Sequence, residues 1–514
     1  MTAAAAALSP GARRALLTIC TMTATIMQAL DTTIANVALP YMQGSLSASQ
    51  DQISWVLTSY IVAAAVMTAP VGWLSDRFGR KKLFLVCVGG FTVASLLCAL
   101  AQNITQIVAF RLMQGMCGAA LVPLSQTALL DAYPIEQRGQ AMGIWGVGIM
   151  LGPIMGPTLG GFLTENYSWH WVFLVNLPVG VLTVFGLLAF MDETKRQEHL
   201  RFDWFGFLAL AAGIGSMQLL LDRGEQLGWF GSSEIVAELI ISVVGFYYFF
   251  AHSLTTDEPF VRFAIFRDRN FLTGCFFMTV ISLMLFSSMA LAAPFIQNVL
   301  NYPIESAGWL LASRGLGTLF GMLMIGRLLR LFEARWLIFA GLILTALTMF
   351  EMNGFTDNTS ARTIMLVGLM QGLGMGLVFI PLSTVAFLTL APRFRTDGTA
   401  MLTLVRNVAS SAGISVMIAN LTAMTTTYHA HLAEFISPFN DALQSVDVTR
   451  WMDLATDQGR ALADQMITMQ AAIMAYANDF LLLAAICVAS IPFVFAIGST
   501  HSLRGGKVAV EVVE

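Results

Sequence analysis

The chain has 514 residues, of which 57% are hydrophobic and only 11% are charged. A soluble domain carries roughly 25% charged residues, and a net charge of -4 lacks the basic excess of a nucleic-acid-binding surface. These values exclude a cytosolic enzyme, a nucleic-acid binder and a disordered protein, and they indicate a polytopic membrane protein.

Apolar segments of about twenty residues, the length that crosses a bilayer of roughly 30 Å, recur along the chain. Lipid cannot satisfy backbone polar groups, and an alternation with period two is absent, so each segment is predicted to be a helix rather than a barrel strand. Fourteen spans are predicted in chain order, at residues 15–38, 53–73, 83–102, 105–127, 139–163, 171–191, 204–221, 234–252, 271–293, 305–325, 336–352, 362–386, 398–421 and 479–498.

The distribution of Lys and Arg predicts how these spans are oriented. If residues 1–14 are cytoplasmic, 20 of the 27 basic residues lie in cytoplasmic segments, 4 lie outside and 3 lie within spans. A miscounted helix would invert every later loop and remove this bias. We therefore expect both termini to be cytoplasmic.

An internal repeat relates two parts of the chain. Leu-Met-Gln-Gly occurs at 112–115 and again at 369–372, and Pro-Leu-Ser at 123–125 and 381–383. The offset of 257–259 places span 4 opposite span 12, which is eight helices along. Two six-helix halves with two extra helices between them account for that offset, and paired halves around a midplane site are typical of transporters.

The predicted fold is therefore an all-α membrane protein built from two six-helix bundles and two inserted helices. The expected divisions are a cytoplasmic N-terminus (1–14), a first bundle (15–191), two inserted helices with their loops (192–270), a second bundle (271–498) that includes an outer loop (422–478), and a cytoplasmic tail (499–514).

Asp31 lies within the first span, where a carboxylate is costly unless it is paired or protonated. It is our candidate for a group that binds and releases a proton; the alternative is a residue that caps a broken helical turn. Arg111, in span 4, cannot lose its proton, but its charge can bias a neighbouring carboxylate. We expect Arg111 to pair with Asp31 or, failing that, with a network of backbone or Gln groups, and a purely structural role between helices is the alternative.

Other intramembrane polar residues are candidates for a substrate cavity. Gln114 shares a helix face with Arg111 because it follows three residues later, and Arg406 with Asn407 is the matching pair in the second half. The full set of cavity candidates is Gln28, Asn36, Gln114, Arg406 and Asn407. Arg314 is also intramembrane, and the sequence assigns it no role.

A charged turn between spans 2 and 3 has the pattern Asp-Arg-x-Gly-Arg-Lys, in which Gly79 permits a tight turn. We interpret it as a cytoplasmic latch between the two halves, with an ordinary positively charged loop as the alternative. The latch residues are Gly72, Asp76, Arg77, Gly79, Arg80 and Lys81.

Glycines recur every four residues in span 5, with two prolines at the same spacing. Glycines on one face let another helix approach closely, and prolines remove backbone hydrogen bonds and allow bending. We interpret the segment as a helix at a moving seam, with static close packing as the alternative. The seam residues are Gly148, Gly152, Pro153, Gly156, Pro157 and Gly160.

Catalytic and metal chemistry are not indicated. His429 and His431 in the outer loop lack further ligands at metal-binding spacing, no phosphate-binding loop occurs, and the six cysteines, all within apolar runs, are expected to be small core residues. We expect no cofactor and no metal, and we interpret the long outer loop as a partner-docking segment.

The motifs together resemble the major facilitator superfamily, in its fourteen-helix drug:proton antiporter branch, over residues 15–498. The resemblance rests on segments 30–36, 72–82, 111–115, 152–161 and 171–180, and segment 152–161 is similar to the antiporter mark of the family. It implies proton-coupled export of hydrophobic or amphipathic drugs across a bacterial inner membrane, with Asp31 and Arg111 as the coupling residues.

The resemblance also implies partners: a periplasmic membrane-fusion adaptor (EmrA-like) and an outer-membrane channel (TolC-like), besides the lipid bilayer, small hydrophobic substrates and protons. One departure is Arg314, since some branch members have an acidic residue in this span. The alternatives are a same-fold exporter of a specific metabolite, fatty acid or siderophore, and, from another class, a membrane enzyme or scaffold.

Overall fold

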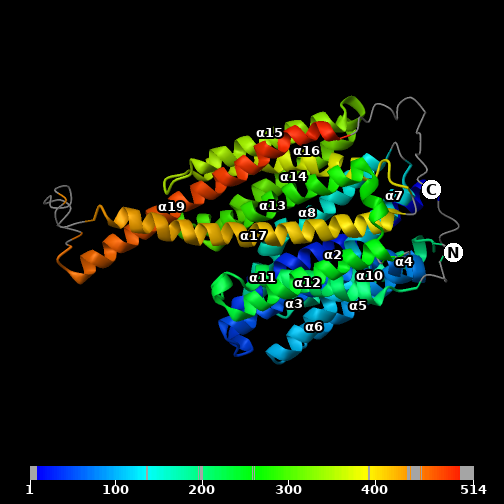
Figure 1. Ribbon diagram of the computed structural model, residues 1–514, viewed down its shortest axis with the longest axis horizontal. Helices are drawn as coiled ribbons and strands as arrows, with labels where there is room; N and C mark the ends of the chain where they lie inside the picture. Colours follow the sequence, from blue (N-terminus) through cyan, green and yellow to red (C-terminus); the bar gives the residue numbers. More distant parts are fainter. Residues whose placement is uncertain are drawn as a thin grey trace.

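The computed structural model describes residues 9–134, 137–194, 196, 201–256, 259, 261–391, 394–436, 440, 452 and 454–497. The chain is largely helical in these ranges and contains no β-strand there, and the helices form an elongated molecule in which the start of α2 and the end of the last described helix lie near the same end (Figure 1). The predicted all-α membrane fold is confirmed. We call the end where the chain begins the basic end, after its Arg- and Lys-containing loops, and the opposite end the hairpin end.

The first bundle contains nine helical segments within the described residues. They are α2 (Pro10–Ser45), α3 (Gln50–Thr68), α4 (Val71–Phe78), α5 (Arg80–Ala99), α6 (Ile104–Gly118), α7 (Leu121–Ala132), α8 (Arg138–Asn166), α9 (Trp171–Leu174) and α10 (Asn176–Phe190). Proline explains the break between α3 and α4: Pro70 ends the first segment, and the two axes are bent by 57°.

Side-chain caps fix several helix starts in this bundle. Ser49 and Gln52 form a capping box at the start of α3, and Asn103 accepts a hydrogen bond from the Gln106 amide at the start of α6. At the basic end, the Glu193 carboxylate accepts from the backbone amides of Lys81 and Lys82 and so caps α5.

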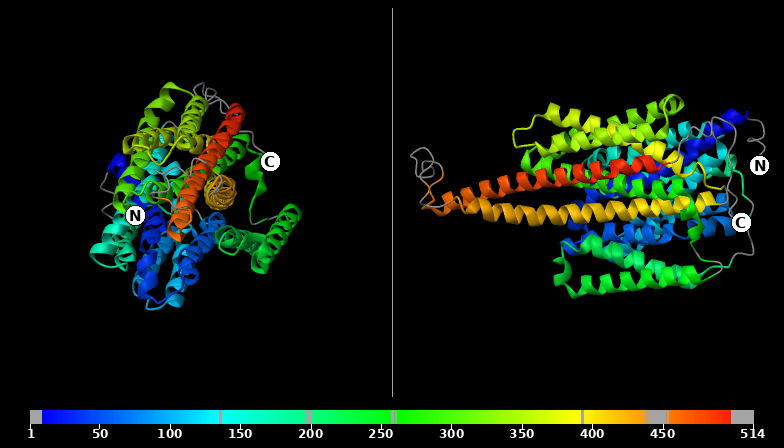
Figure 2. Two further views of the ribbon diagram at one scale, coloured as in Figure 1. Left: turned by 90° about the vertical axis from the view of Figure 1, so that its left-hand side faces the viewer. Right: turned by 45° about the horizontal axis from the view of Figure 1, so that its top comes forward.

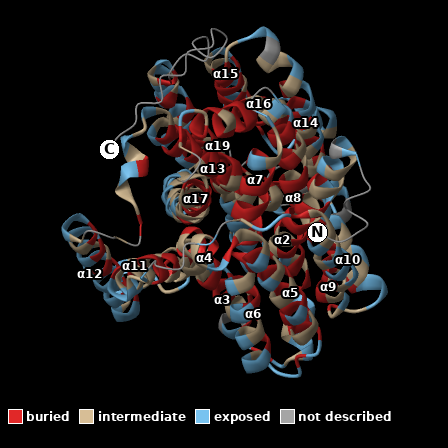
Figure 3. Cartoon of the chain, turned by 90° about the vertical axis from the view of Figure 1, so that its right-hand side faces the viewer, coloured by how far each residue is buried: buried red, intermediate tan, exposed pale blue. Residues whose placement is uncertain are grey.

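Two helices follow the first bundle and pack on each other: α11 (Trp204–Arg223) and α12 (Ser233–Thr255), with the short 3₁₀ helices η2 (Trp229–Gly231) and η3 (Phe263–Arg267) after each. Gly213 on α11 lies against Gly245 on α12, which allows the close approach. The pair lies at the side of the molecule, where α11 faces the bundles and α12 is largely exposed on its outer face (Figure 3).

The second bundle follows the inserted pair. Its segments are α13 (Arg269–Pro294), the π-helix η4 (Phe295–Val299), α14 (Ile304–Leu331), α15 (Ala334–Asn353), α16 (Ala361–Ala386), α17 (Arg395–Ala433), α19 (Asp457–Ser490) and the 3₁₀ helix η7 (Ile491–Ala496). The largest buried apolar cluster lies mainly in this bundle, and many large apolar side chains elsewhere point outward, as lipid requires.

The stretch 422–478, which we predicted to be a loop, is helical over much of its length. Helix α17 continues to Ala433, and α19 begins at Asp457, where the Thr456 side chain accepts from the Gly459 amide. The two helices extend past the rest of the molecule as an antiparallel hairpin (Figures 1 and 2). The difference arises because the polar residues of the stretch include good helix formers and an N-cap, which hydropathy alone does not detect.

Twelve helices of the described chain are long and apolar enough to cross a membrane, and the bent pair α3–α4 makes thirteen. Helix α8 is 29 residues long and includes side chains outside the described set. The fourteenth span therefore remains a prediction.

Candidate functional site

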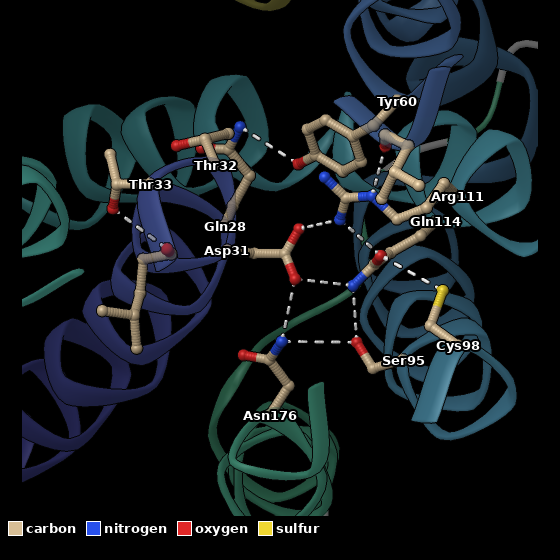
Figure 4. Close-up of polar contacts among 12 residues, drawn as sticks. Gln28, Asp31, Thr32, Thr33, Tyr60, Ser95, Cys98, Arg111, Gln114 and Asn176 are labelled. Atoms are coloured by element: carbon tan, nitrogen blue, oxygen red, sulfur yellow. Dashed lines mark hydrogen bonds and ion pairs between the residues drawn. The ribbon is translucent and has the colours of Figure 1, made fainter. Parts of the chain in front are cut away.

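A charged cluster lies inside the first bundle, away from solvent. The Asp31 side chain is 0% exposed, and its neighbours come from α2, α3, α5, α6 and α10 (Figure 4). Arg111 donates from Nη1 to Asp31 Oδ2 at 2.6 Å, and both side chains of this ion pair are almost completely buried. The structure thus brings together the two residues that the sequence analysis paired.

Two amide side chains bind the other carboxylate oxygen. Gln114 Nε2 donates to Asp31 Oδ1 at 2.8 Å, and Asn176 Nδ2 donates to the same atom at 3.1 Å. Both amides also contact Ser95 Oγ, at 2.6 and 3.4 Å, so a hydroxyl on α5 holds the two donors together. Each described contact to Asp31 comes from a donor, and this arrangement suits the ionised carboxylate.

The guanidinium of Arg111 is held on several sides. Its Nε donates to the Val56 carbonyl at 2.9 Å, and Nη1 also donates to Gln114 Oε1 at 2.8 Å. Its Cζ lies 4.2 Å from the centroid of the Tyr60 ring, which is a cation–π contact. Tyr60 in turn accepts a weak hydrogen bond from Gln28 at 3.5 Å, so one of the predicted cavity residues borders the cluster.

This arrangement can couple a proton to a change of packing. A proton on Asp31 would remove its negative charge and leave the Arg111 cation buried without a counter-charge, which is strongly unfavourable. The cluster would then be stable only after its helices rearrange. A buried acid–base pair between several helices is therefore a suitable proton-operated switch.

The remaining cavity candidates lie in different surroundings. Gln114 is 0% exposed and belongs to the Asp31 cluster itself, whereas Asn36 is exposed on α2. On α17, Arg406 and Asn407 are partly buried, and Arg406 Nη2 contacts Asn407 Oδ1 at 3.4 Å. These residues do not form one cluster among the described contacts.

At the basic end, charged residues of the predicted latch contact the second bundle. Arg80 pairs with Asp131 and donates from Nη2 to Thr396 Oγ1 at 3.1 Å, while Arg395 donates to Asp131 Oδ1 at 2.7 Å. Asp131 is thus shared between an arginine of each bundle. Asp131 and Arg395, which were not among the predicted latch residues, complete this contact.

A second charged group lies beside it. Arg262, from the loop before η3, lies 3.8 Å from Asp76 on α4 and 3.9 Å from Asp397 on α17. Gly72 faces Asp397 so closely that a Cβ atom would overlap its carboxylate. A side chain at Gly72 would therefore separate α4 from α17.

The other predicted latch residues make contacts close to the first bundle rather than with the second. Gly79 has a φ of 90°, a conformation that glycine adopts readily, and its missing side chain makes room for Glu193. Lys81 donates from Nζ to the Leu188 carbonyl at 2.8 Å. Arg77 has a buried Nη1 atom that lacks a hydrogen-bond partner within the described part of the chain.

Three glycines of helix α8 lie against helix α2. Gly152, Gly156 and Gly160 face α2, where a Cβ atom at Gly152 would overlap the Ala29 backbone. Thr33, two residues after Asp31, donates to the Gly152 carbonyl at 3.0 Å. The predicted seam thus lies against the helix that carries Asp31, within the first bundle.

The second bundle touches α8 nearer the basic end. Gly143 and Gly146 face Met322, and Trp145 stacks on Phe379 with ring centroids 6.3 Å apart. Gly148 faces Met22 and Ile26 of α2, and the side chains of Pro153 and Pro157 lie outside the described residues.

Several polar residues of the site were not predicted. Tyr60, Ser95 and Asn176 escaped notice because uncharged polar residues are common between membrane helices. Asp479 on α19 is 0% exposed and accepts from Asn420 Nδ2 at 2.5 Å. Its charge within an apolar run was a signal that could have identified it, as for Asp31.

The described residues contain no group of His, Cys, Asp and Glu arranged to hold a metal ion.

Two bundles that meet through polar contacts at one end, with a buried ion pair inside the first of them and many apolar helices, define a multi-pass membrane transporter. The sequence model of the Major Facilitator Superfamily matches residues 21–413, and the chain belongs to that family. The family consists of transporters rather than enzymes, and the resemblance inferred from the motifs is confirmed.

Named relatives are similar over nearly the whole length. The multidrug export protein EmrB of Escherichia coli (strain K12) is 33% identical over 92% of this chain and 93% of its own. The fatty acid resistance protein FarB of Neisseria gonorrhoeae is 30% identical over 96% of this chain and 98% of its own. The protein is thus a transporter related to multidrug export proteins.

Solved structures show the same fold at low sequence identity. A double-tryptophan mutant of XylE superposes with a TM-score of 0.62 and 13% identity, covering 94% of this chain and 95% of that one. The human organic anion transporter MFSD10 superposes with a TM-score of 0.56 and 14% identity, covering 92% and 99%.

Proposed function

We propose that the protein is a proton-coupled antiporter that exports hydrophobic or amphipathic drugs across a bacterial inner membrane by alternating access. The observation that carries this proposal is the buried Asp31–Arg111 pair, 2.6 Å between Oδ2 and Nη1. The relationship to EmrB, a multidrug export protein, supports the substrate class. The positive bias of one set of loops supports cytoplasmic termini.

In the proposed cycle, the described structure corresponds to a state closed at the basic end. The polar contacts between the two bundles that the structure describes lie there, around Asp131, Thr127 and Arg262. A proton entering Asp31 releases Arg111, loosens the packing of α2 on its neighbours and favours the opposite tilt of the bundles. The charged latch re-forms when the proton leaves.

The division of the chain follows from the same proposal. We assign residues 15–191 and 271–498 to the two moving bundles and 192–270 to the inserted pair. Helix α11, at the side of the molecule, contacts both bundles: Asp222 accepts a hydrogen bond from Thr58 of α3, and Gln218 donates to Ser411 of α17 at 2.5 Å. Helix α11 therefore lies along the boundary between the two bundles.

We propose that the α17–α19 hairpin docks a periplasmic adaptor, so that the protein acts as the pump of a tripartite efflux system with an outer-membrane channel. The hairpin extends beyond the bundle at the end opposite the basic loops (Figure 2). His429 and Asp464 connect its two helices at 3.0 Å.

A second candidate function is export of one fatty-acid-like compound, which is supported by the similarity to FarB, a fatty acid resistance protein. A resistance profile separates the two candidates. Cells that express the protein with its adaptor should resist several unrelated hydrophobic drugs if the first candidate holds, and only fatty acids if the second holds.

The proton role is tested by Asp31→Asn in inverted membrane vesicles energised with a pH gradient. Asparagine keeps the size and one accepting oxygen but cannot titrate, so we expect drug transport driven by the gradient to fall at least tenfold. Asp357→Asn, at an exposed position, is the control and should transport like the wild type. Wild-type transport by Asp31→Asn would refute the proposal.

A further inference from the structure

A second carboxyl group is buried in the other bundle. Asp479 on α19 is 0% exposed, and its Oδ1 accepts from Asn420 Nδ2 on α17 at 2.5 Å. Its Oδ2 atom is also buried and has no hydrogen-bond partner among the described residues. Tyr476 and Phe480, which flank it on the same helix, belong to the largest buried apolar cluster. The carboxyl group therefore has one described donor in mainly apolar surroundings.

No cation of the described chain compensates this group. None of the ion pairs formed by the described residues includes Asp479. Arg314, the buried cation of the same bundle, donates to Ser288 instead. By contrast, Asp31 has Arg111 besides two amide donors. An ionised Asp479 would be a buried, unpaired charge, which is costly, and a bound proton removes that cost.

The surroundings of Asp479 contain few groups that could replace such a proton. Tyr476 is one turn earlier on α19, and the two side chains interact electrostatically. The elements that pack on α19 include α13, α15, α17 and η4, and η4 carries no charge. Outside the hairpin, the charged residues of these elements are Arg269 on α13, Arg335 and Glu351 on α15, and Arg395, Asp397 and Arg406 on α17. None of them pairs with Asp479 in the part of the chain that the structure describes.

Asp479 lies where the α17–α19 hairpin leaves the bundle. The Tyr476 ring, one turn closer to the tip, contacts Phe295 at the hairpin end of α13, with centroids 5.2 Å apart. From Asn420, helix α17 runs back without interruption to the basic end, where Thr399 contacts α7 of the first bundle (Figure 1). One helix thus connects the buried carboxyl group to the contact between the bundles.

We propose that Asp479 is a second proton-binding site, and that α17 couples its occupancy to the opening of the basic end. In the closed state the proton is on Oδ2, while Asn420 donates to Oδ1. When the basic end opens, α17 moves Asn420 relative to Asp479, the favoured protonation state changes, and a proton passes between the carboxyl group and water. Drug binding at Asp31 alone leaves this proton in place. The role in exchange rests on the proposed antiport, whereas reversible proton binding does not.

Infrared spectroscopy of the purified protein tests the proton binding, because a protonated carboxyl group has a C=O stretching band that the ionised group lacks. Spectra are recorded over a series of pH values, from mildly acidic to mildly alkaline, in which an exposed aspartate is ionised. The difference between wild type and Asp479→Asn isolates the band of this residue. Asp357→Asn, at an exposed position, is the matched control.

We expect a band in the wild type at mildly acidic pH that is lost as the pH rises, is missing from Asp479→Asn and is retained in Asp357→Asn. Asn420→Ala should keep the band to a higher pH, because the amide donor stabilises the ionised form. Identical spectra of wild type and Asp479→Asn at every pH would overturn the proposal. An unchanged midpoint in Asn420→Ala would overturn the assigned role of α17.

Thermal unfolding is the second readout. Asparagine resembles the neutral acid, so Asp479→Asn should melt like the wild type at mildly acidic pH. As the pH rises, the wild type alone acquires a buried charge and should become the less stable of the two. A melting temperature of Asp479→Asn well below that of the wild type at every pH would show a purely structural hydrogen bond, and the proposal would fail.

Proteoliposomes test the exchange itself. The number of protons carried per drug molecule should be lower by one in Asp479→Asn than in the wild type and unchanged in Asp357→Asn. Equal numbers in Asp479→Asn and the wild type would overturn the exchange role. A wild type that carries no drug would refute the proposed function and the exchange role with it, while the infrared spectra would still decide whether Asp479 binds a proton.

Discussion

Asp31 and Arg111 depend on each other because neither charge has another compensating group nearby. Three side chains donate to the carboxylate, and the guanidinium makes contacts to a carbonyl, an amide and an aromatic ring besides. Removal of one partner of a buried ion pair leaves the other uncompensated, at a cost of about 3–5 kcal/mol, whereas removal of both can be nearly neutral.

This dependence predicts a rescue. Arg111→Gln should lower the stability of the purified protein by about 3–5 kcal/mol, because the Asp31 carboxylate then has no counter-charge. The double variant with Asp31→Asn should recover at least half of the lost melting temperature. Thermal unfolding in detergent measures both, and a double variant less stable than Arg111→Gln would contradict the pairing.

The sequence was sufficient to predict this pair, since a lone acid and a lone base within apolar spans have few other partners. It was not sufficient to assign Gln114, which we expected in a substrate cavity and which lies in the charged cluster. A three-residue spacing shows which helix face a residue shares, but the identity of the facing helix depends on tertiary packing.

Helix α8 approaches α2 closely because glycines leave no side chains between them. Gly152 lies against the backbone of Ala29, two residues before the proton-binding candidate. Backbone cannot move aside as a flexible side chain can, so this contact fixes the position of Asp31 relative to α8.

Gly152→Ala should therefore separate α8 from α2, despite the higher helix propensity of alanine. We expect a loss of about 1–3 kcal/mol from overpacking and a lower transport rate. The matched control is Gly161→Ala on the same helix, where a Cβ atom meets nothing within 4 Å and stability should not fall. Thermal unfolding and vesicle transport measure the effects; similar behaviour of the two variants would show that the α2–α8 contact is not tight.

Helix positions were predictable where lipid dictates them, because about twenty apolar residues must form a helix in a bilayer. The extension of α17 and α19 was not, since outside the lipid the same residues could form a loop or a helix. Alanines and the Thr456 cap favour a helix there, and packing of one helix on the other completes the hairpin.

The two bundles meet at the basic end through polar groups as well as apolar packing. Thr127 on α7 and Thr399 on α17 have hydroxyl oxygens 2.8 Å apart, close to the pair of arginines on Asp131. The repeat predicted two bundles, but it could not predict which end is closed, because one sequence encodes both states of an alternating transporter.

A disulfide at this contact should stop the cycle. In a background in which the six native cysteines are replaced, Thr127→Cys with Thr399→Cys should cross-link under oxidation and reduce transport at least tenfold. Reductant should restore transport, and each single substitution should transport like its background under both conditions. Undiminished transport by the cross-linked protein would show that the basic end need not open.

Proton release from the purified protein tests the central claim most directly. When drug is added to the detergent-solubilised protein in weakly buffered solution, over a series of pH values, a pH-sensitive dye should report proton release from the wild type and none from Asp31→Asn. Equal proton release by both proteins, with drug binding intact, would place the coupling proton on another group and contradict the account.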